Sequence, residues 1–119
     1  MEWSLDRKRP ICPQLCEQLC IMIAAGKFHA GCRLPSVRDI ALSAGVNPNT
    51  VQKSLETLAE QGVVYPERGS GWFVSDTKNI AAEITNDVIR QKTAADVETM
   101  KALGMDLAQI IEYVKEWKE

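Results

Sequence analysis

A run of polar side chains near the middle of the chain has the residue types that hydrogen-bond to the edges of nucleic-acid bases. Asparagine and glutamine amides can pair bidentately with adenine, and threonine offers a methyl group to thymine and a hydroxyl to a base or a phosphate. Apolar residues at Val51, Leu55 and Leu58 indicate a helix that turns one side to the core. The residues left to face outward at its amino end are Asn49, Thr50, Gln52 and Lys53.

Three cysteines form a second group with chemical potential. Cys12, Cys16 and Cys20 lie four residues apart, so on a helix their thiols form one row. Such a row could act as a thiol switch or bind a soft metal ion such as Cu(I) or zinc. Without a nearby fourth ligand or a CxxC pair it is a poor zinc site, and cysteine also packs as a small hydrophobic residue. We therefore expect core packing and no bound metal or cofactor.

Enzymatic chemistry has no candidate residues in this sequence. There is no nucleophile–base pair, phosphate-binding loop or metal cluster, and the single histidine, His29, has no partner motif. We therefore expect a protein that is not an enzyme.

Composition places the chain among ordinary globular domains. It has 119 residues, of which 45% are hydrophobic and 25% charged. No apolar run approaches the roughly 18 residues that span a bilayer, and the first residues do not form a secretion signal. We expect a cytoplasmic protein that does not contact membranes.

The formal net charge of −2 is unevenly distributed, with about +1 in residues 1–75 and −3 in residues 76–119. A basic domain with a pI above about 9 is typical of nucleic-acid binding. Any contact of this chain with DNA must therefore come from locally placed groups.

Apolar periodicity and capping residues predict three helices in the first half of the chain. The first has an apolar stripe that recurs every four residues. The second begins at Ser36 as its N-cap, and the third begins with Asn47 as N-cap and Pro48 in the first turn. The predicted helices cover residues 13–26, 36–45 and 47–62.

Two runs of strand-forming residues follow these helices. Residues 63–65 and 72–74 are rich in valine and aromatic residues, and residues 66–71 between them are typical of a hairpin loop. Two helices joined by a short glycine-containing turn form a helix-turn-helix. With the hairpin after it, the order predicts a winged helix-turn-helix.

This fold predicts where DNA would be contacted. The amino end of a recognition helix enters the major groove, which is about 12 Å wide. Arg38 in the preceding helix can clamp the DNA backbone, and Ser36 can donate a hydrogen bond to it. At the tip of the hairpin, Arg68 and Gly69 would approach the minor groove or its phosphates. The predicted DNA-binding residues are Ser36, Arg38, Asn47, Asn49, Thr50, Gln52, Lys53, Arg68, Gly69 and Ser70.

Three stretches of the chain resemble the GntR family of bacterial transcription regulators. They read LPSVRDIA at residues 34–41, GVNPNTVQ at residues 45–52 and ERGSGWFV at residues 67–74. The resemblance covers residues 10–75, and the remainder resembles the YtrA subfamily, whose C-terminal part is only two helices. It implies a regulator of a neighbouring operon, often one that encodes an ABC transporter. It also implies DNA contact by Arg38, Asn49, Thr50, Gln52 and Gly69.

The chain departs from the family pattern at three positions. Some members have arginine where this chain has Pro48 and Gln52, so direct readout of guanine at those positions is lost. Ser70 stands where lysine is frequent in the wing, which removes one phosphate contact. These departures affect the expected operator sequence rather than the expected activity.

Residues 76–119 carry apolar stripes that two helices cannot bury against each other. Asp106 is predicted to cap the last helix, with Gln109 completing a capping box. Pairing with a second chain would cover the stripes, and a two-fold dimer is the commonest arrangement. The alternative is that the segment packs back on its own winged helix. The predicted dimerisation residues are Ile80, Ile84, Val88, Leu107, Ile110, Ile111, Val114 and Trp117.

The sequence thus predicts a mainly α protein with a small β-hairpin. Residues 1–75 would form the winged helix-turn-helix DNA-binding domain and residues 76–119 a two-helix dimerisation segment. The expected function is a sequence-specific repressor that binds a pseudopalindromic operator as a homodimer. A small-molecule effector could bind between the last segment and the winged helix, although no residue identifies one.

Two alternatives stay open. One is a thiol- or metal-responsive regulator that acts through Cys12, Cys16 and Cys20. The other is a winged helix that binds a protein, which is disfavoured because the outward-facing residues include no aromatic hot spot.

Overall fold

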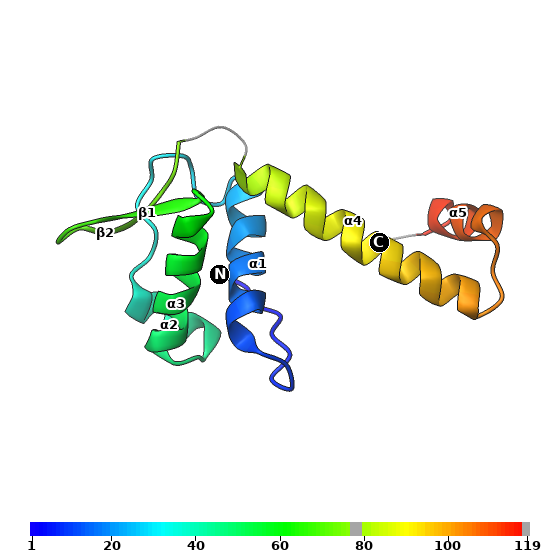
Figure 1. Ribbon diagram of the computed structural model, residues 1–119, viewed down its shortest axis with the longest axis horizontal. Helices are drawn as coiled ribbons and strands as arrows, with labels where there is room; N and C mark the ends of the chain where they lie inside the picture. Colours follow the sequence, from blue (N-terminus) through cyan, green and yellow to red (C-terminus); the bar gives the residue numbers. More distant parts are fainter. Residues whose placement is uncertain (77–79, 118–119) are drawn as a thin grey trace. The chain divides into compact units, whose positions relative to one another are not determined.

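The computed structural model of the protein describes residues 1–76 and 80–117. Contacts divide the chain into two compact units, Met1–Thr85 and Asn86–Glu119, and each is described by itself. The predicted fold class is confirmed, since the described residues are mainly helical with one small antiparallel sheet (Figure 1). The elements are α1 Ile11–Ala24, α2 Val37–Ala44, α3 Pro48–Glu60, β1 Val64–Glu67, β2 Gly71–Val74, α4 Ile80–Ala102 and α5 Leu107–Lys115.

Helix α1 begins two residues earlier than the sequence pattern predicts. Pro10 occupies the N-cap, so Pro13 lies in the first turn, where backbone N–H groups have no partner in the helix and proline is tolerated. At the other end, Gly26 adopts a φ of 81°, as expected for the residue after a helix C-cap.

The turn between α2 and α3 follows from its capping residues. Ser36 Oγ accepts a hydrogen bond from the Asp39 backbone N–H at 3.0 Å, which caps the start of α2. Gly45 ends α2 in the left-handed region with a φ of 67°. Asn47 then caps α3, with Pro48 in its first turn. The predicted helix-turn-helix is confirmed.

The hairpin is longer and its turn shorter than predicted. The strands run through Glu67 and from Gly71, and Pro66 pairs with Trp72 inside the ladder. Proline is compatible with this position because β1 is an edge strand, and a missing N–H on its outer side breaks no ladder bond. Only residues 68–70 remain as the turn.

The connection between α1 and α2 pairs with the outer side of β2, which the sequence pattern did not predict. The Leu34 N–H donates to the carbonyl of Trp72 at 2.8 Å, and the Val74 N–H donates to the carbonyl of Cys32 at 2.9 Å. The wing is therefore held along β2 by backbone hydrogen bonds on both sides.

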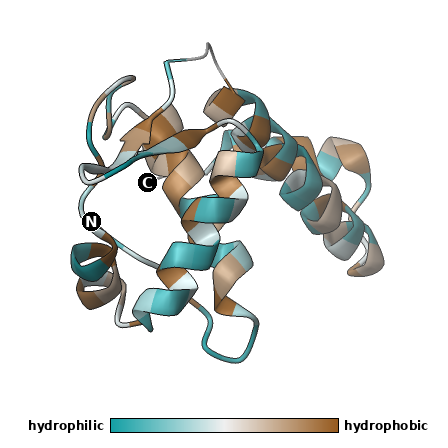
Figure 2. Ribbon diagram, turned by 60° about the vertical axis from the view of Figure 1, so that its left-hand side comes forward, coloured by the Kyte–Doolittle hydropathy of each residue, from teal (hydrophilic) through white to brown (hydrophobic). Residues whose placement is uncertain are grey.

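The core of the first unit lies between the three N-terminal helices and the base of the hairpin. Leu15 and Leu19 of α1 meet Val51 and Leu55 of α3, and all four are fully buried. In Figure 2 the helices carry brown hydrophobic and teal hydrophilic residues on successive turns, as expected for helices that bury one side. The buried core residues are Leu15, Leu19, Cys20, Leu34, Ile40, Ala41, Ala44, Val51, Leu55, Leu58, Val63, Val64 and Val74.

The first unit extends beyond the predicted boundary at residue 75. Ile80, Ala81 and Ile84 in the first turns of α4 pack against its core and are half-buried there. Ile80 and Ile84 are therefore partly buried against their own winged helix, without a second chain. For these two residues this corresponds to the alternative prediction, in which the segment packs back on the winged helix of the same chain.

The second unit contains the rest of α4 and α5. Asp106 and Gln109 form both hydrogen bonds of a capping box, each at 2.8 Å, as the sequence predicted. Ile110 is the buried residue of α5. Among the described helices, none is both long and apolar enough to cross a membrane.

Candidate nucleic-acid interface

The amino end of α3 is open to solvent. Three buried residues, Val51, Leu55 and Leu58, attach this helix to the core along one side. On the other side Asn49 and Lys53 are exposed. Thr50 and Gln52, the other predicted base contacts of α3, are half-buried at the edge of this surface.

Two predicted contact residues also hold helix ends in place. The Asn47 side-chain oxygen accepts from the Asn49 N–H at 2.8 Å, so one of its two lone pairs is engaged in the cap, and the amide NH₂ can still donate to DNA. Ser36 Oγ accepts from Asp39, which leaves its hydroxyl proton available to donate to a phosphate. Both residues therefore hold in place the helix ends at which DNA contact is predicted.

Gln52 is engaged by a residue that sequence reasoning missed. Its Nε2 donates to Glu56 Oε1 at 3.1 Å, one helical turn further along α3. Bidentate pairing with adenine uses both the oxygen and the nitrogen of the amide, so this bond must be rearranged or shared when a base binds. The spacing of four residues between the two side chains was the available signal.

The remaining predicted contacts lie at the start of α2 and at the tip of the wing. Arg38 is exposed in the first turn of α2, and Arg68, Gly69 and Ser70 are all exposed in the turn between β1 and β2. Figure 1 shows the hairpin projecting on the side of the first unit where α2 and α3 lie, with α1 on the other side. Gly69 has a φ of 79° and faces open space, so close approach of a DNA backbone is unhindered there.

The segment before α1 supports this surface from behind. The Arg7 guanidinium donates to the carbonyl of Ala44 at 2.7 Å and to the carbonyl of Gly45 at 3.1 Å. It thereby places a positive charge at the carboxyl end of α2, where the helix dipole favours it, and holds the turn that leads into α3. Trp3 Nε1 donates to Ser43 Oγ at 2.9 Å in the same region. No local pattern in the sequence connects Arg7 to a turn 37 residues away.

Cys12, Cys16 and Cys20 belong to α1, and Cys12 and Cys16 contact Ser54 of α3. Ser54 is fully buried, and its hydroxyl donates to the carbonyl of Thr50 at 2.9 Å. The Cys16 thiol donates to the carbonyl of Ser54 at 3.4 Å. Burial raises the pKa of Cys16 to about 12 and that of Cys20 to about 11. The thiolate is the form that attacks oxidants and binds metal, so these two thiols are poor sensors at neutral pH.

No group of three metal-binding side chains comes together in residues 1–76 and 80–117. The hypothesis of a thiol- or metal-responsive regulator therefore gains no support from the positions of Cys12, Cys16 and Cys20.

Thiol alkylation checks the structural role of the cysteines. In native protein at pH 8, iodoacetamide should modify the exposed Cys32 well before Cys16 and Cys20, because those two are shielded and remain protonated. Mass spectrometry of peptides separates Cys32 from the other three residues. Modification of Cys16 as fast as Cys32 would contradict the packing described here, and urea-unfolded protein, in which all four should react alike, is the control.

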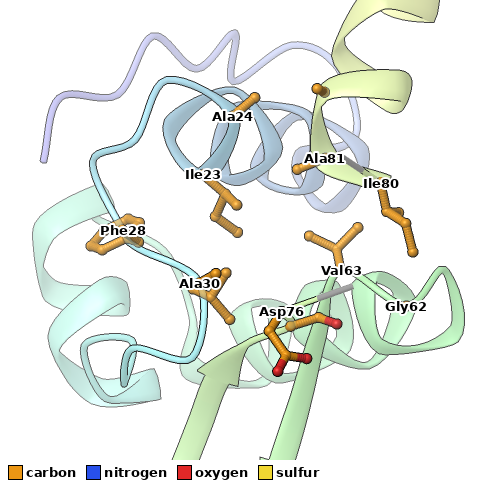
Figure 3. A pocket seen from close by; sticks show the side chains of 12 residues that line it. Ile23, Ala24, Phe28, Ala30, Gly62, Val63, Asp76, Ile80 and Ala81 are labelled. Atoms are coloured by element: carbon orange, nitrogen blue, oxygen red, sulfur yellow. The ribbon is translucent and has the colours of Figure 1, made fainter. Parts of the chain in front are cut away.

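A cavity of about 280 Å³ lies at the base of the hairpin within the first unit. Figure 3 shows Ile23, Phe28, Val63 and Ile80 around it, and its walls are largely apolar. It adjoins the first turn of α4, which corresponds to the place where an effector was expected. That an effector binds there stays a prediction.

Comparison with known proteins agrees with this geometry. The family model described as "Bacterial regulatory proteins, gntR family" matches residues 13–74. The chain is 30% identical over 108 residues to the HTH-type transcriptional repressor YtrA of Bacillus subtilis, covering 90% of this chain and 83% of YtrA.

Solved structures give the same result. A GntR family transcriptional regulator from Listeria monocytogenes matches with a TM-score of 0.85 and 32% identity, over 96% of this chain and all of that one. The AraR DBD in complex with operator ORE1 matches with a TM-score of 0.55 and 26% identity, over 63% of this chain and 94% of that one. The chain therefore belongs to the GntR family of DNA-binding transcriptional regulators, among its YtrA-like members with a short helical C-terminal part.

Proposed function

We propose that the protein is a homodimeric repressor that binds a pseudopalindromic operator. The observation that carries this proposal is the exposed amino end of α3, where Asn49 and Lys53 face solvent beside the capped turn from α2. Similarity to the repressor YtrA and to an AraR domain bound to its operator supports the same function.

The recognition step follows from the placement of the polar side chains. The amino end of α3 enters the major groove, where Asn49, Thr50 and Gln52 reach base edges. Arg38 and the wing residues Arg68 and Gly69 contact the sugar-phosphate backbone on either side, which sets the register without reading sequence. Lys53 adds a positive charge near the groove. Together these groups give a local cationic and polar surface on a chain whose net charge is −2.

Dimerisation is supported by apolar residues that stay exposed in the second unit. Leu107, Ile111 and Val114 lie at i, i+4 and i+7 on α5 and are 53%, 45% and 59% exposed. Trp117, just beyond the end of α5, is also exposed, to 67%, with its ring beside that of Tyr113. Monomeric proteins seldom expose a contiguous apolar patch of this kind, and a second copy would cover it symmetrically. Of the other predicted residues, Val88 is half-buried and Ile110 is buried within the unit.

Two-fold symmetry of the protein predicts two-fold symmetry of the operator. Two recognition helices read inverted half-sites whose centres lie one helical turn of about 10 base pairs, or a multiple of it, apart. Occupation of such a site near a promoter would exclude RNA polymerase and thereby repress transcription. The resemblance to the YtrA subfamily favours an operon next to the protein's own gene, of the kind that encodes a transporter.

Footprinting on the DNA upstream of the protein's own gene tests this proposal. DNase I protection should reveal one region with inverted half-sites that overlaps the promoter, and transcription in vitro should fall as that region fills. Uniform protection without a preferred region, or increased transcription on binding, would refute the repressor assignment.

A further inference from the structure

Arg33 lies on the wing, although it belongs to the connection between α1 and α2. Its backbone forms an antiparallel bridge with Phe73 of β2. The residues on both sides of Arg33 are hydrogen-bonded to β2, since Leu34 donates to Trp72 and Val74 donates to Cys32. Arg33 is therefore held in extended backbone beside β2.

The side chain of Arg33 reaches along β2 toward the tip of the wing. A Cβ atom placed on Gly71 would lie 3.4 Å from Arg33 Nε and 3.6 Å from its Nη2, so the guanidinium lies over the bare backbone of Gly71. Gly71 is the first residue of β2 and directly follows the turn that holds Arg68, Gly69 and Ser70. A Cβ atom there would make only ordinary van der Waals contact with the guanidinium, so it is the φ of 104° rather than the available space that favours glycine at position 71.

Among residues 1–76 and 80–117, the guanidinium of Arg33 has no acidic partner. The residue is exposed, and in the described residues it forms neither an ion pair nor a side-chain hydrogen bond. Arg9 and Arg90, which are also exposed, differ in this respect, since Arg9 pairs with Asp6 at 3.1 Å and Arg90 with Asp87 at 3.4 Å. Arg33 thus keeps all of its donors available for an anion.

Arg33 also lies between the two groups of predicted backbone contacts. Along the chain it precedes Ser36 and Arg38 at the start of α2, and across β2 it adjoins the turn with Arg68. The wing of this chain has a serine at position 70, so the side chain there cannot supply a positive charge. A guanidinium presents a planar fork of donors that matches two phosphate oxygens.

We propose that Arg33 binds a phosphate of the DNA backbone beside the wing and supplies the positive charge that position 70 lacks. This inference rests on DNA binding by the winged helix-turn-helix. Because a phosphate carries no sequence information, Arg33 contributes equally to binding of any duplex, and its contribution depends on salt.

Salt-dependent binding of Arg33→Gln tests the proposal. Affinities of the full-length protein are measured by fluorescence anisotropy, at several KCl concentrations, for a duplex from its own upstream region and for a scrambled duplex of equal length. The logarithm of the association constant falls linearly with the logarithm of the KCl concentration, and loss of one phosphate contact makes this slope shallower by about 0.9. A dimer loses two contacts, so its slope should become shallower by about 1.8. At about 0.1 M KCl the variant should bind both duplexes more weakly, by a similar factor of roughly 60, and this loss should shrink as the KCl concentration rises toward about 1 M.

Two variants serve as controls. Arg90→Gln removes the same charge from an exposed ion pair on α4 and should leave the slope unchanged. Arg33→Lys keeps the charge and should restore most of the slope, which a purely structural role of Arg33 in the wing does not predict. This rescue decides the question even if Arg33→Gln proves less stable in thermal unfolding.

An unchanged slope in Arg33→Gln would overturn the proposal, as would a loss confined to the upstream duplex, since that would indicate base readout. Failure of the wild-type protein to bind either duplex would instead contradict the DNA-binding function itself. The two failures are therefore distinguishable.

Discussion

Ile111→Asp should convert the protein from a dimer into a monomer at micromolar concentration and weaken operator binding at least a hundredfold. Ile111 lies at the centre of the exposed stripe formed with Leu107 and Val114. Burying a carboxylate there without a partner costs several kcal/mol, which outweighs the apolar gain of association. A monomer binds one half-site and loses the effective concentration, in the millimolar range, that links the two halves.

Sedimentation equilibrium measures the oligomeric state, and anisotropy with the operator duplex measures the affinity. Ala108→Asp is the matched control, because it adds the same charge to an exposed position on a different side of α5 and should leave the dimer intact. Ile110 is unsuitable for this test, since it is 4% exposed and a charge there would disrupt the second unit. A wild-type protein that sediments as a monomer, or an Ile111→Asp protein that stays dimeric, would contradict the proposed interface.

Asn49→Ala should remove much of the discrimination between the operator and other DNA. A bidentate amide contact with adenine contributes about 1–3 kcal/mol of discrimination, so each half-site should lose roughly 5-fold to 150-fold in specific affinity. Affinity for a scrambled duplex should stay nearly unchanged, because phosphate contacts supply nonspecific binding. The side chain of Asn49 is exposed, so the melting temperature should change little.

Arg38→Ala provides the contrast, because a phosphate contact at this position predicts an equal loss on both duplexes and a lower salt slope. Asn86→Ala removes the same amide group from an exposed position on α4 and should change neither affinity. Equal losses on the operator and scrambled duplexes for Asn49→Ala would show that Asn49 does not read a base.

Local signals made much of the fold predictable. The caps at Ser36 and Asn47 and the box of Asp106 with Gln109 depend on residues within three positions of each other, so their spacing in the sequence was sufficient. The hairpin itself was predictable from two runs of strand formers. Its length was not, because Pro66 reads as a turn residue unless its place in a two-stranded ladder is known.

Long-range contacts account for the parts of the candidate site that the sequence did not reveal. Arg7 meets the end of α2, and Arg33 meets Gly71, across separations at which helical or strand periodicity carries no information. The same reason applies to Ile80 and Ile84, whose apolar pattern is equally compatible with a dimer interface and with the core of the first unit. Leu107, Ile111 and Val114 of α5, by contrast, are exposed in the single chain. A dimer interface therefore stays the prediction for these three residues.

Sequence-specific binding through the amino end of α3 is the central claim, and the ratio of two affinities tests it most directly. Wild-type protein should bind the duplex protected in its own upstream region at least about a thousandfold more tightly than a scrambled duplex at physiological salt. Only the weaker, nonspecific affinity should be set almost entirely by salt. Equal affinity for the two duplexes at every salt concentration would contradict the claim.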